Sequence, residues 1–173
     1  VKPQEDGGGS NSRIWSHFSS IEEIVDLPDG MQISHYTISS QHSSNNFGTV
    51  IHEMYHQLGA ADLYPVEHVT VNQEWEGIGK WDIMAKGNWN GNGIWPALPT
   101  SPSIELVGGD RHLDMQLNWL PGTDCFGPKV EMKGLSEGGN SLKIPIGDKE
   151  YIWIEYRSYS GYDSRLPGNG ILV

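Results

Sequence analysis

The residues with the clearest chemical potential are two histidines four positions apart, His52 and His56, with Glu53 directly after the first. In a helix, side chains four residues apart lie on one face, so both imidazoles can reach the same ion. Neutral imidazole nitrogens are good ligands for zinc. Glu53 is one step further round the helix, beside the ion, where it can take a proton from a zinc-bound water and pass it to a leaving amine. The H-E-x-x-H pattern therefore predicts a catalytic zinc centre.

A catalytic zinc centre needs a third protein ligand and one open position. Gly59 allows a sharp turn after the second histidine, and Asp62 follows three residues later, where its carboxylate can return to the ion. His68 and His112 are the alternatives for this place. Asp62 is the favoured third ligand, because its carboxylate also offsets part of the ion's charge. The remaining histidines are expected to be structural: His17, His35 and His42.

The element that must hold both histidines is a helix over about residues 47–58. Its apolar residues follow the three-, four- and seven-residue spacing of one buried face. They are Phe47, Val50, Ile51, Met54, Tyr55 and Leu58. The polar residues 43–46 offer N-cap candidates, and Gly59 is well placed to end the helix. We therefore expect the apolar side to pack inward, with both histidines on the other flank.

The remaining elements indicate a mixed α/β (α+β) fold in a single domain over residues 1–173. Residues 14–26 are expected to contain a short helix that starts at Ser19 or Ser20, and residues 31–38 are expected to form a strand. Residues 62–114 are rich in Gly, Asn, Pro and Trp, and a long irregular segment of this kind is typical of functional regions. Residues 142–146 and 151–156 read as the two strands of a hairpin.

Charge and composition exclude several classes of partner. The 173 residues include 22 acidic and 11 basic ones, for a formal net charge of −11. Nucleic acid and anionic membrane surfaces are unfavourable partners, since both are bound through Lys and Arg. The acidity serves solubility or the binding of hard cations such as calcium. Cys125 is the only cysteine, so no disulfide forms within the chain, and no stretch is long enough to span a bilayer.

Several further side chains have both a functional and a structural interpretation. Four aromatic residues either line a substrate cleft or pack in the core, namely Tyr64, Trp81, Trp89 and Trp95. Glu155 and Arg157 alternate with apolar residues on a strand, and they are expected to form a surface or structural ion pair.

The zinc segment extends to H-E-x-x-H-x-x-G-x-x-D followed by Leu63-Tyr64, and in this form it resembles the immune inhibitor A family of secreted bacterial metallopeptidases, the M6 peptidases. Other stretches agree with that family in the same order: residues 14–17 (IWSH), 79–89 (GKWDIMAKGNW), 117–120 (LNWL), 154–157 (IEYR), 161–163 (GYD) and 166–173 (LPGNGILV). The resemblance runs from about Arg13 to the end. It is most specific in the zinc segment and in the WDIM segment at 81–84.

This resemblance implies a secreted, metzincin-like catalytic domain that hydrolyses internal peptide bonds of proteins and peptides with zinc as cofactor. In such domains a methionine turn forms an apolar floor beneath the metal, and Met84, 22 residues after Asp62, matches its position. Calcium is common in these enzymes, so it is a second expected cation. The family usually has a β-sheet before its IWSH-like segment and continues beyond its GILV-like strand, so this chain is expected to be a fragment.

Two other functions are compatible with the same residues. One is a metal-binding or adhesive module of a larger surface protein, without catalytic activity, and the intact Glu53 argues against it. The other is hydrolysis of a non-protein substrate by the same zinc centre. Nucleophilic cysteine chemistry has little support, because Cys125 has no identifiable base near it in the sequence.

Overall fold

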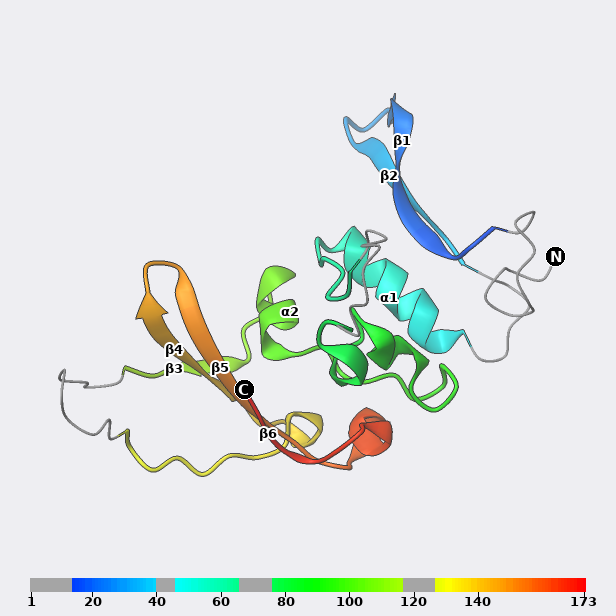
Figure 1. Ribbon diagram of the computed structural model, residues 1–173. Coiled ribbons are helices and arrows are strands. Elements are labelled where there is room, and N and C mark those ends of the chain that lie inside the picture. Colours follow the sequence, from blue (N-terminus) through cyan, green and yellow to red (C-terminus); the bar gives the residue numbers. More distant parts are fainter. Residues whose placement is uncertain (1–13, 40–45, 66–75, 117–126) are drawn as a thin grey trace.

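The fold combines one antiparallel sheet and one mixed sheet with short helices. The coarse prediction of a mixed α/β chain is therefore confirmed. A computed structural model describes residues 14–39, 46–65, 76–116 and 127–173. Within these ranges, β1 and β2 form a two-stranded sheet, and a four-stranded sheet has the order β3-β4-β5-β6. Helix α1 lies between the two sheets, with helix α2 and the irregular segment after residue 76 beside it (Figure 1).

Helix α1 (Phe47–Gln57) carries the two histidines, as predicted from the sequence. Asn46 takes the N-cap position, and Leu58 ends the helix in a right-handed conformation. Gly59 follows with a φ of +101°, a left-handed conformation that costs glycine little. The chain can therefore reverse directly after His56 and return toward the helix.

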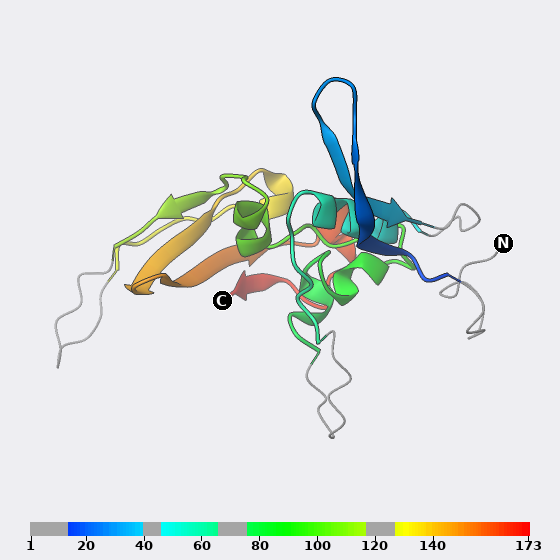
Figure 2. The same cartoon turned by 90° about the horizontal axis from the view of Figure 1, so that it is seen from above.

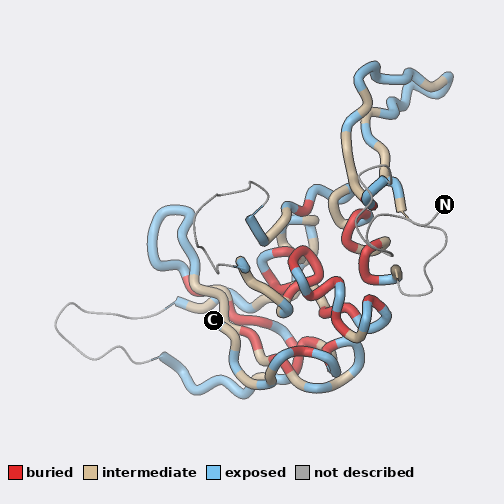
Figure 3. The backbone as a smooth tube through the Cα atoms, turned by 45° about the vertical axis from the view of Figure 1, so that its right-hand side comes forward, coloured by how far each residue is buried: buried red, intermediate tan, exposed pale blue. Residues whose placement is uncertain are grey.

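The predicted buried face of α1 is only partly correct, because Ile51 and Tyr55 pack against the apolar core but most of the remaining positions are less buried. Three of its apolar side chains are largely exposed, Phe47 at 44%, Met54 at 57% and Leu58 at 62%. Across the molecule, buried residues gather in the central part (Figure 3). In α1, the buried side chains include polar ones on the other flank, Thr49, His52 and Glu53. A close backbone approach explains this orientation, because a Cβ atom at Gly48 would lie 1.9 Å from the carbonyl oxygen of Asn88. The flank of the helix that carries His52 and Glu53 thus packs toward the segment around residue 88.

The hairpin of β1 (His17–Asp26) and β2 (Gln32–Ile38) stands away from the rest of the molecule (Figures 1 and 2). The strand at 31–38 is confirmed, but the helix expected within 14–26 is wrong. Antiparallel pairing from His17–Ile38 to Asp26–Gln32 overrides the local helix signals, with a register shift between Ser20 and Val25. The base of the hairpin is tied to α1 by a 2.8 Å hydrogen bond from Gln57 Nε2 to Thr37 Oγ1.

The four-stranded sheet contains the predicted hairpin. Its strands are β3 (His112–Asp114), β4 (Ser141–Gly147), β5 (Glu150–Arg157) and β6 (Gly170–Leu172). Strands β4 and β5 pair antiparallel, while β3 joins β4 in parallel. The segment expected to be irregular holds helix α2 (Ser101–Leu106) and the 3₁₀ turns η1 (Gly79–Trp81) and η2 (Lys86–Trp89). Two further 3₁₀ turns are η3 (Leu135–Glu137) and η4 (Gly161–Arg165).

A small apolar core lies between α1 and the segment that follows η1. Ala60, Ile83 and Met84 are its buried members, at 7%, 2% and 0% exposure. Partly buried apolar side chains surround them, from Ile51, Tyr55, Leu63 and Val107. Among the described residues, no helix combines the length and the apolar character that crossing a membrane requires.

Candidate metal centre

Three of the predicted ligand atoms converge on one point beside α1. Nε2 of His52 lies 3.1 Å from Oδ1 of Asp62, and Nε2 of His56 lies 3.3 Å from the same oxygen. All three ligand atoms are within 4.8 Å of one another. Within the described part of the chain, this is the one group of three or more His, Cys, Asp or Glu side chains close enough to hold a metal ion.

The hydrogen bonds of the two imidazoles show which nitrogens face the shared point. Nδ1 of His52 lies 2.7 Å from the carbonyl oxygen of Ile83, and Nδ1 of His56 lies 2.9 Å from that of Ala60. A carbonyl only accepts, so each Nδ1 carries the proton and donates it. In the neutral rings, each Nε2 then presents a lone pair toward Asp62, which is also an acceptor. Such a meeting of acceptors is relieved by a cation between them or by a proton on one of the rings.

The donor set fits zinc. Oδ1 of Asp62 is buried and has no hydrogen-bond partner, which is unusual for a carboxylate oxygen. Zinc bonds of about 2.0–2.2 Å at tetrahedral angles place ligand atoms about 3.3–3.5 Å apart, close to the two separations between Asp62 Oδ1 and the Nε2 atoms. Two imidazoles and one carboxylate also leave a fourth position for water, as catalytic zinc sites require.

Without a metal ion, protons take its place in the cluster. Burial on its own would raise the pKa of Asp62, but the adjacent imidazoles of His52 and His56 outweigh it and lower that pKa well below its ordinary value. The carboxylate in turn raises the pKa of His56, against the opposing effect of burial. The metal-free cluster is therefore stabilised by a proton on an imidazole that zinc would displace.

These shifts predict how pH acts on stability. The raised pKa of His56 stabilises the metal-free protein below the ordinary histidine value of 6.5, and this is lost as pH rises through the folded-state pKa. The lowered pKa of Asp62 adds stability above its ordinary 3.8, which is lost on acidification. Zinc needs the neutral imidazole, so the rise in Tm on adding zinc should grow between about pH 5.5 and pH 8. Calorimetry of the chelated and the zinc-loaded protein measures this rise in Tm. A rise in Tm that shrinks as pH increases contradicts the assignment of the metal ligands.

Glu53 is buried beside the cluster, at 6% exposure, and comes from the same flank of α1 as His52. Burial raises its pKa, while the two imidazoles and a hydrogen bond from the backbone N–H of Phe18 act in the opposite direction. The ring of Phe18 also stacks on His56, with centroids 5.6 Å apart. Strand β1 therefore closes one side of the centre and holds the carboxylate of Glu53 in place.

Met84 lies in the small apolar core next to α1. It is fully buried and packs with Ala60 and Ile83, the two residues whose carbonyls accept from the imidazoles. Its backbone oxygen also accepts from Leu63 N–H at 2.9 Å, which ties it to the chain next to Asp62. Met84 thus supports the backbone next to the ligands and is not one of the converging groups.

A cleft of about 450 Å³ opens from the centre, with His52 and Glu53 in its wall. Its aromatic lining comes from Trp15, Tyr64 and Trp89, while the ion pair of Lys86 and Glu76 lies at its exposed side. Two of the four candidate cleft aromatics, Tyr64 and Trp89, therefore lie in it. Trp81 and Trp95 are not part of its lining.

Tyr64 separates this cleft from a second, apolar hollow of about 410 Å³ that is lined by Asp62, Leu63 and Ile78. Its ring stacks near His52, with centroids 6.3 Å apart. Burial, followed by the nearby charge of Asp62, raises the pKa of Tyr64 to about 12. Its hydroxyl therefore remains a proton donor beside the metal ligands.

The other histidines lie apart from the cluster or outside the described residues. His112 faces Glu105, Asp110 and Asp114 at 3.6–3.7 Å on the far sheet, so it does not replace Asp62. His17 contacts Trp15 and Tyr36, and His35 stacks on Phe18, in agreement with structural roles. His42, His68 and Cys125 lie outside the described residues.

Sequence reasoning missed the groups that orient the centre. The carbonyls of Ala60 and Ile83 have no signature, because any residue type supplies a backbone oxygen. The role of Phe18 could not be predicted, because a helix was incorrectly expected within residues 14–26. Trp15 belongs to the IWSH segment, and the match of that segment to the family is the one signal that could have drawn attention to it.

Comparison of the chain with protein-family models, with curated proteins and with solved structures gives no match. The arrangement of His52, His56, Asp62 and Glu53 is therefore the basis for assigning a function.

Proposed function

We propose that this chain is the zinc-binding part of a secreted, metzincin-like endopeptidase related to the immune inhibitor A family. The observation that carries the proposal is the approach of Asp62 Oδ1 to both Nε2 atoms, at 3.1 and 3.3 Å, with buried Glu53 beside them. The sequence motif of the family and the cleft next to the cluster support it. Met84, in the core next to α1, takes the part of the methionine turn.

The residues have separate roles in peptide hydrolysis. A zinc ion held by His52, His56 and Asp62 would lower the pKa of a bound water toward about 7. Glu53 accepts the proton that the attacking water loses and gives it to the amine of the departing peptide. Tyr64 contributes its ring to the cleft wall, and its hydroxyl lies close to the carboxylate of Asp62.

The cleft favours peptide substrates with bulky apolar side chains near the cleaved bond. Trp15 and Trp89 provide large apolar surfaces in its wall, at 52% and 40% exposure. Aromatic surfaces of this kind gain free energy when an apolar side chain covers them. The substrates we propose are therefore extended segments of proteins.

Casein digestion by the purified chain tests the function. We expect cleavage that stops when 1,10-phenanthroline removes zinc and returns when zinc is restored, whereas calcium alone does not restore it. If folded, zinc-loaded protein leaves casein and gelatin intact, the endopeptidase proposal fails and a non-catalytic metal-binding module becomes the better account. Zinc-dependent hydrolysis of a small ester without proteolysis would instead indicate a non-protein substrate.

A further inference from the structure

The short segment Trp81–Met84 determines how His52 faces the proposed metal site. The carbonyl oxygen of Ile83 accepts from Nδ1 of His52 at 2.7 Å and so keeps the Nε2 lone pair directed toward Asp62. If that carbonyl turned away, the imidazole would lose both its orientation and the reason for carrying its proton on Nδ1. The groups that fix this peptide unit are therefore part of the site.

The peptide unit after Ile83 is held on its amide side by Asp82. Oδ1 of Asp82 accepts from the backbone N–H of Met84 at 2.6 Å. The N–H of Met84 belongs to the same rigid peptide plane as the carbonyl of Ile83, so a group that holds the N–H also sets the direction of the oxygen. Asp82 thus acts on His52 through one peptide plane.

The second oxygen of Asp82 is held from the opposite side. Oδ2 accepts from the N–H and the hydroxyl of Thr100, at 2.6 and 2.5 Å, and from the hydroxyl of Ser103 at 2.8 Å. The side chain of Asp82 is fully buried, with 0% exposure, so these bonds have no competition from water. The carboxylate therefore has a single orientation, set by the N-terminal part of α2.

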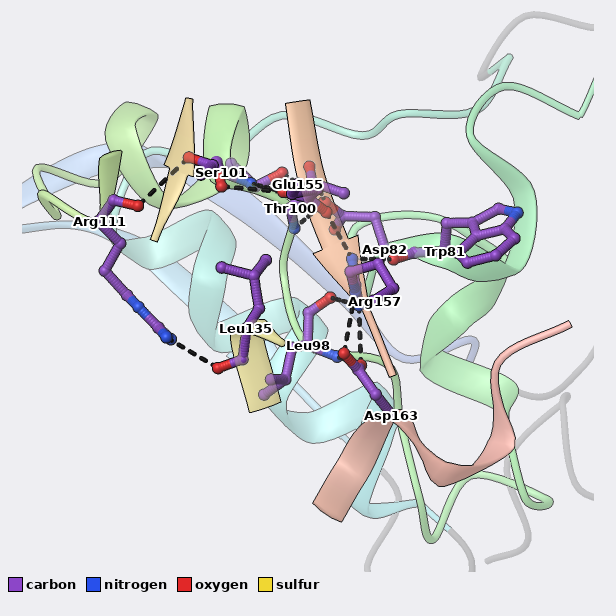
Figure 4. Close-up of polar contacts among 12 residues, drawn as sticks. Trp81, Asp82, Leu98, Thr100, Ser101, Arg111, Leu135, Glu155, Arg157 and Asp163 are labelled. Atoms are coloured by element: carbon purple, nitrogen blue, oxygen red, sulfur yellow. Dashed lines mark hydrogen bonds and ion pairs between the residues drawn. The ribbon is translucent and has the colours of Figure 1, made fainter. Parts of the chain in front are cut away.

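Residues from β5 hold the peptide unit between Trp81 and Asp82. Arg157 donates from Nη1 to the carbonyl oxygen of Trp81 at 3.0 Å, and Figure 4 shows this contact next to the bonds of Asp82. Glu155, paired with Arg157, accepts from the N–H and hydroxyl of Ser101 at 3.0 and 2.8 Å. The backbone on both sides of Asp82 is anchored to the same buried polar network.

We propose that Asp82 is a positioning residue of the metal centre: by holding the Met84 N–H, it orients the Ile83 carbonyl that fixes the tautomer and direction of His52. This inference rests on the proposed metal site. It assigns no contact between Asp82 and the ion or the substrate. It gives the WDIM segment a second role beside the apolar floor supplied by Met84.

The test compares Asp82→Asn with Asp163→Asn at a temperature where circular dichroism shows both proteins folded. Asp163 is an equally buried carboxylate of the same network, but it accepts from Arg157 and from the N–H of Leu98 and not from the segment 81–84. Competition with a chromophoric chelator measures the zinc affinity, and ¹⁵N NMR of the metal-free protein measures the imidazole tautomers.

We expect Asp82→Asn to weaken zinc binding about 10- to 100-fold, the usual effect of removing a group that orients a ligand. His52 should also change from a single Nδ1–H tautomer to a mixture. Asp163→Asn should keep the parental zinc affinity and tautomer. If Asp82→Asn does not fold, Ser103→Ala, which removes one donor to the same oxygen, should shift both readouts in the same direction by less.

Equal loss of affinity in the Asp82 and Asp163 variants would overturn the inference, as would an unchanged His52 tautomer in Asp82→Asn. If Ser103→Ala is the variant tested, a parental zinc affinity together with the parental His52 tautomer would overturn the inference in the same way. If the parent chain itself binds no zinc, the proposed metal site fails, which is a distinct result.

Discussion

Replacement of Glu53 by Gln is expected to lower kcat/KM for a casein-derived fluorogenic peptide by about 10²–10⁴-fold, the usual contribution of a general base. The amide has nearly the same shape but cannot accept the proton from the attacking water. Glu53 is not one of the three converging ligands, so the variant should retain its zinc. Initial-rate kinetics, with zinc content measured on the same preparation, provide both values.

Glu105→Gln is the matched control, because this carboxylate pairs with Lys143 on the far side of the molecule, at 2.7 Å. It should digest the peptide at the parental rate. Should the Glu53→Gln protein also digest at that rate, water activation by Glu53 is wrong. If it loses zinc as well as activity, Glu53 acts as a ligand and not as the base.

Replacement of Arg157 by Met is expected to destabilise the fold by about 3–5 kcal/mol, as loss of one partner of a buried ion pair generally does. The guanidinium is fully buried and donates to Asp163 at 2.8 and 2.9 Å and to Glu155 at 2.8 Å. Its removal leaves two buried carboxylates without their cation, and the carbonyls of Trp81 and Leu98 lose a donor. Urea denaturation followed by circular dichroism measures the loss.

The control for this variant is Lys86→Met, which removes an exposed ion pair with Glu76, at 50% and 58% side-chain exposure. Its unfolding free energy should stay within about 1 kcal/mol of the parent, because water screens such pairs. Equal urea concentrations at the unfolding midpoint for Arg157→Met and the parent would show that the buried network adds little to stability.

The sequence predicts those parts of the site that depend on local spacing. The helix at 47–58 follows from apolar spacing and a glycine stop, and the structure has it at Phe47–Gln57. The i, i+4 spacing of His52 and His56 places both rings on one side of the helix, and the turn at Gly59 brings Asp62 back to them. These features need only one stretch of chain, so a reader of the sequence can find them.

Features that depend on distant parts of the chain were not predicted correctly. Apolar periodicity indicates an inward face at Phe47 and Met54, but the close approach of Gly48 to Asn88 buries His52 and Glu53 instead. Alternation on the strand does not distinguish a surface from a structural pair for Glu155 and Arg157, and the pair is buried. Strand β5 buries its charged side because partners 50 or more residues away meet it there, including Ser101 and Trp81. Such pairings have no local signature.

Anomalous diffraction from crystals of the purified chain, recorded on both sides of the zinc edge, tests the metal centre most directly. We predict one peak within bonding distance of His52 Nε2, His56 Nε2 and Asp62 Oδ1, with a fourth position open to solvent. A peak located elsewhere, or an occupied site completed by another side chain in place of Asp62, would contradict this account of the protein.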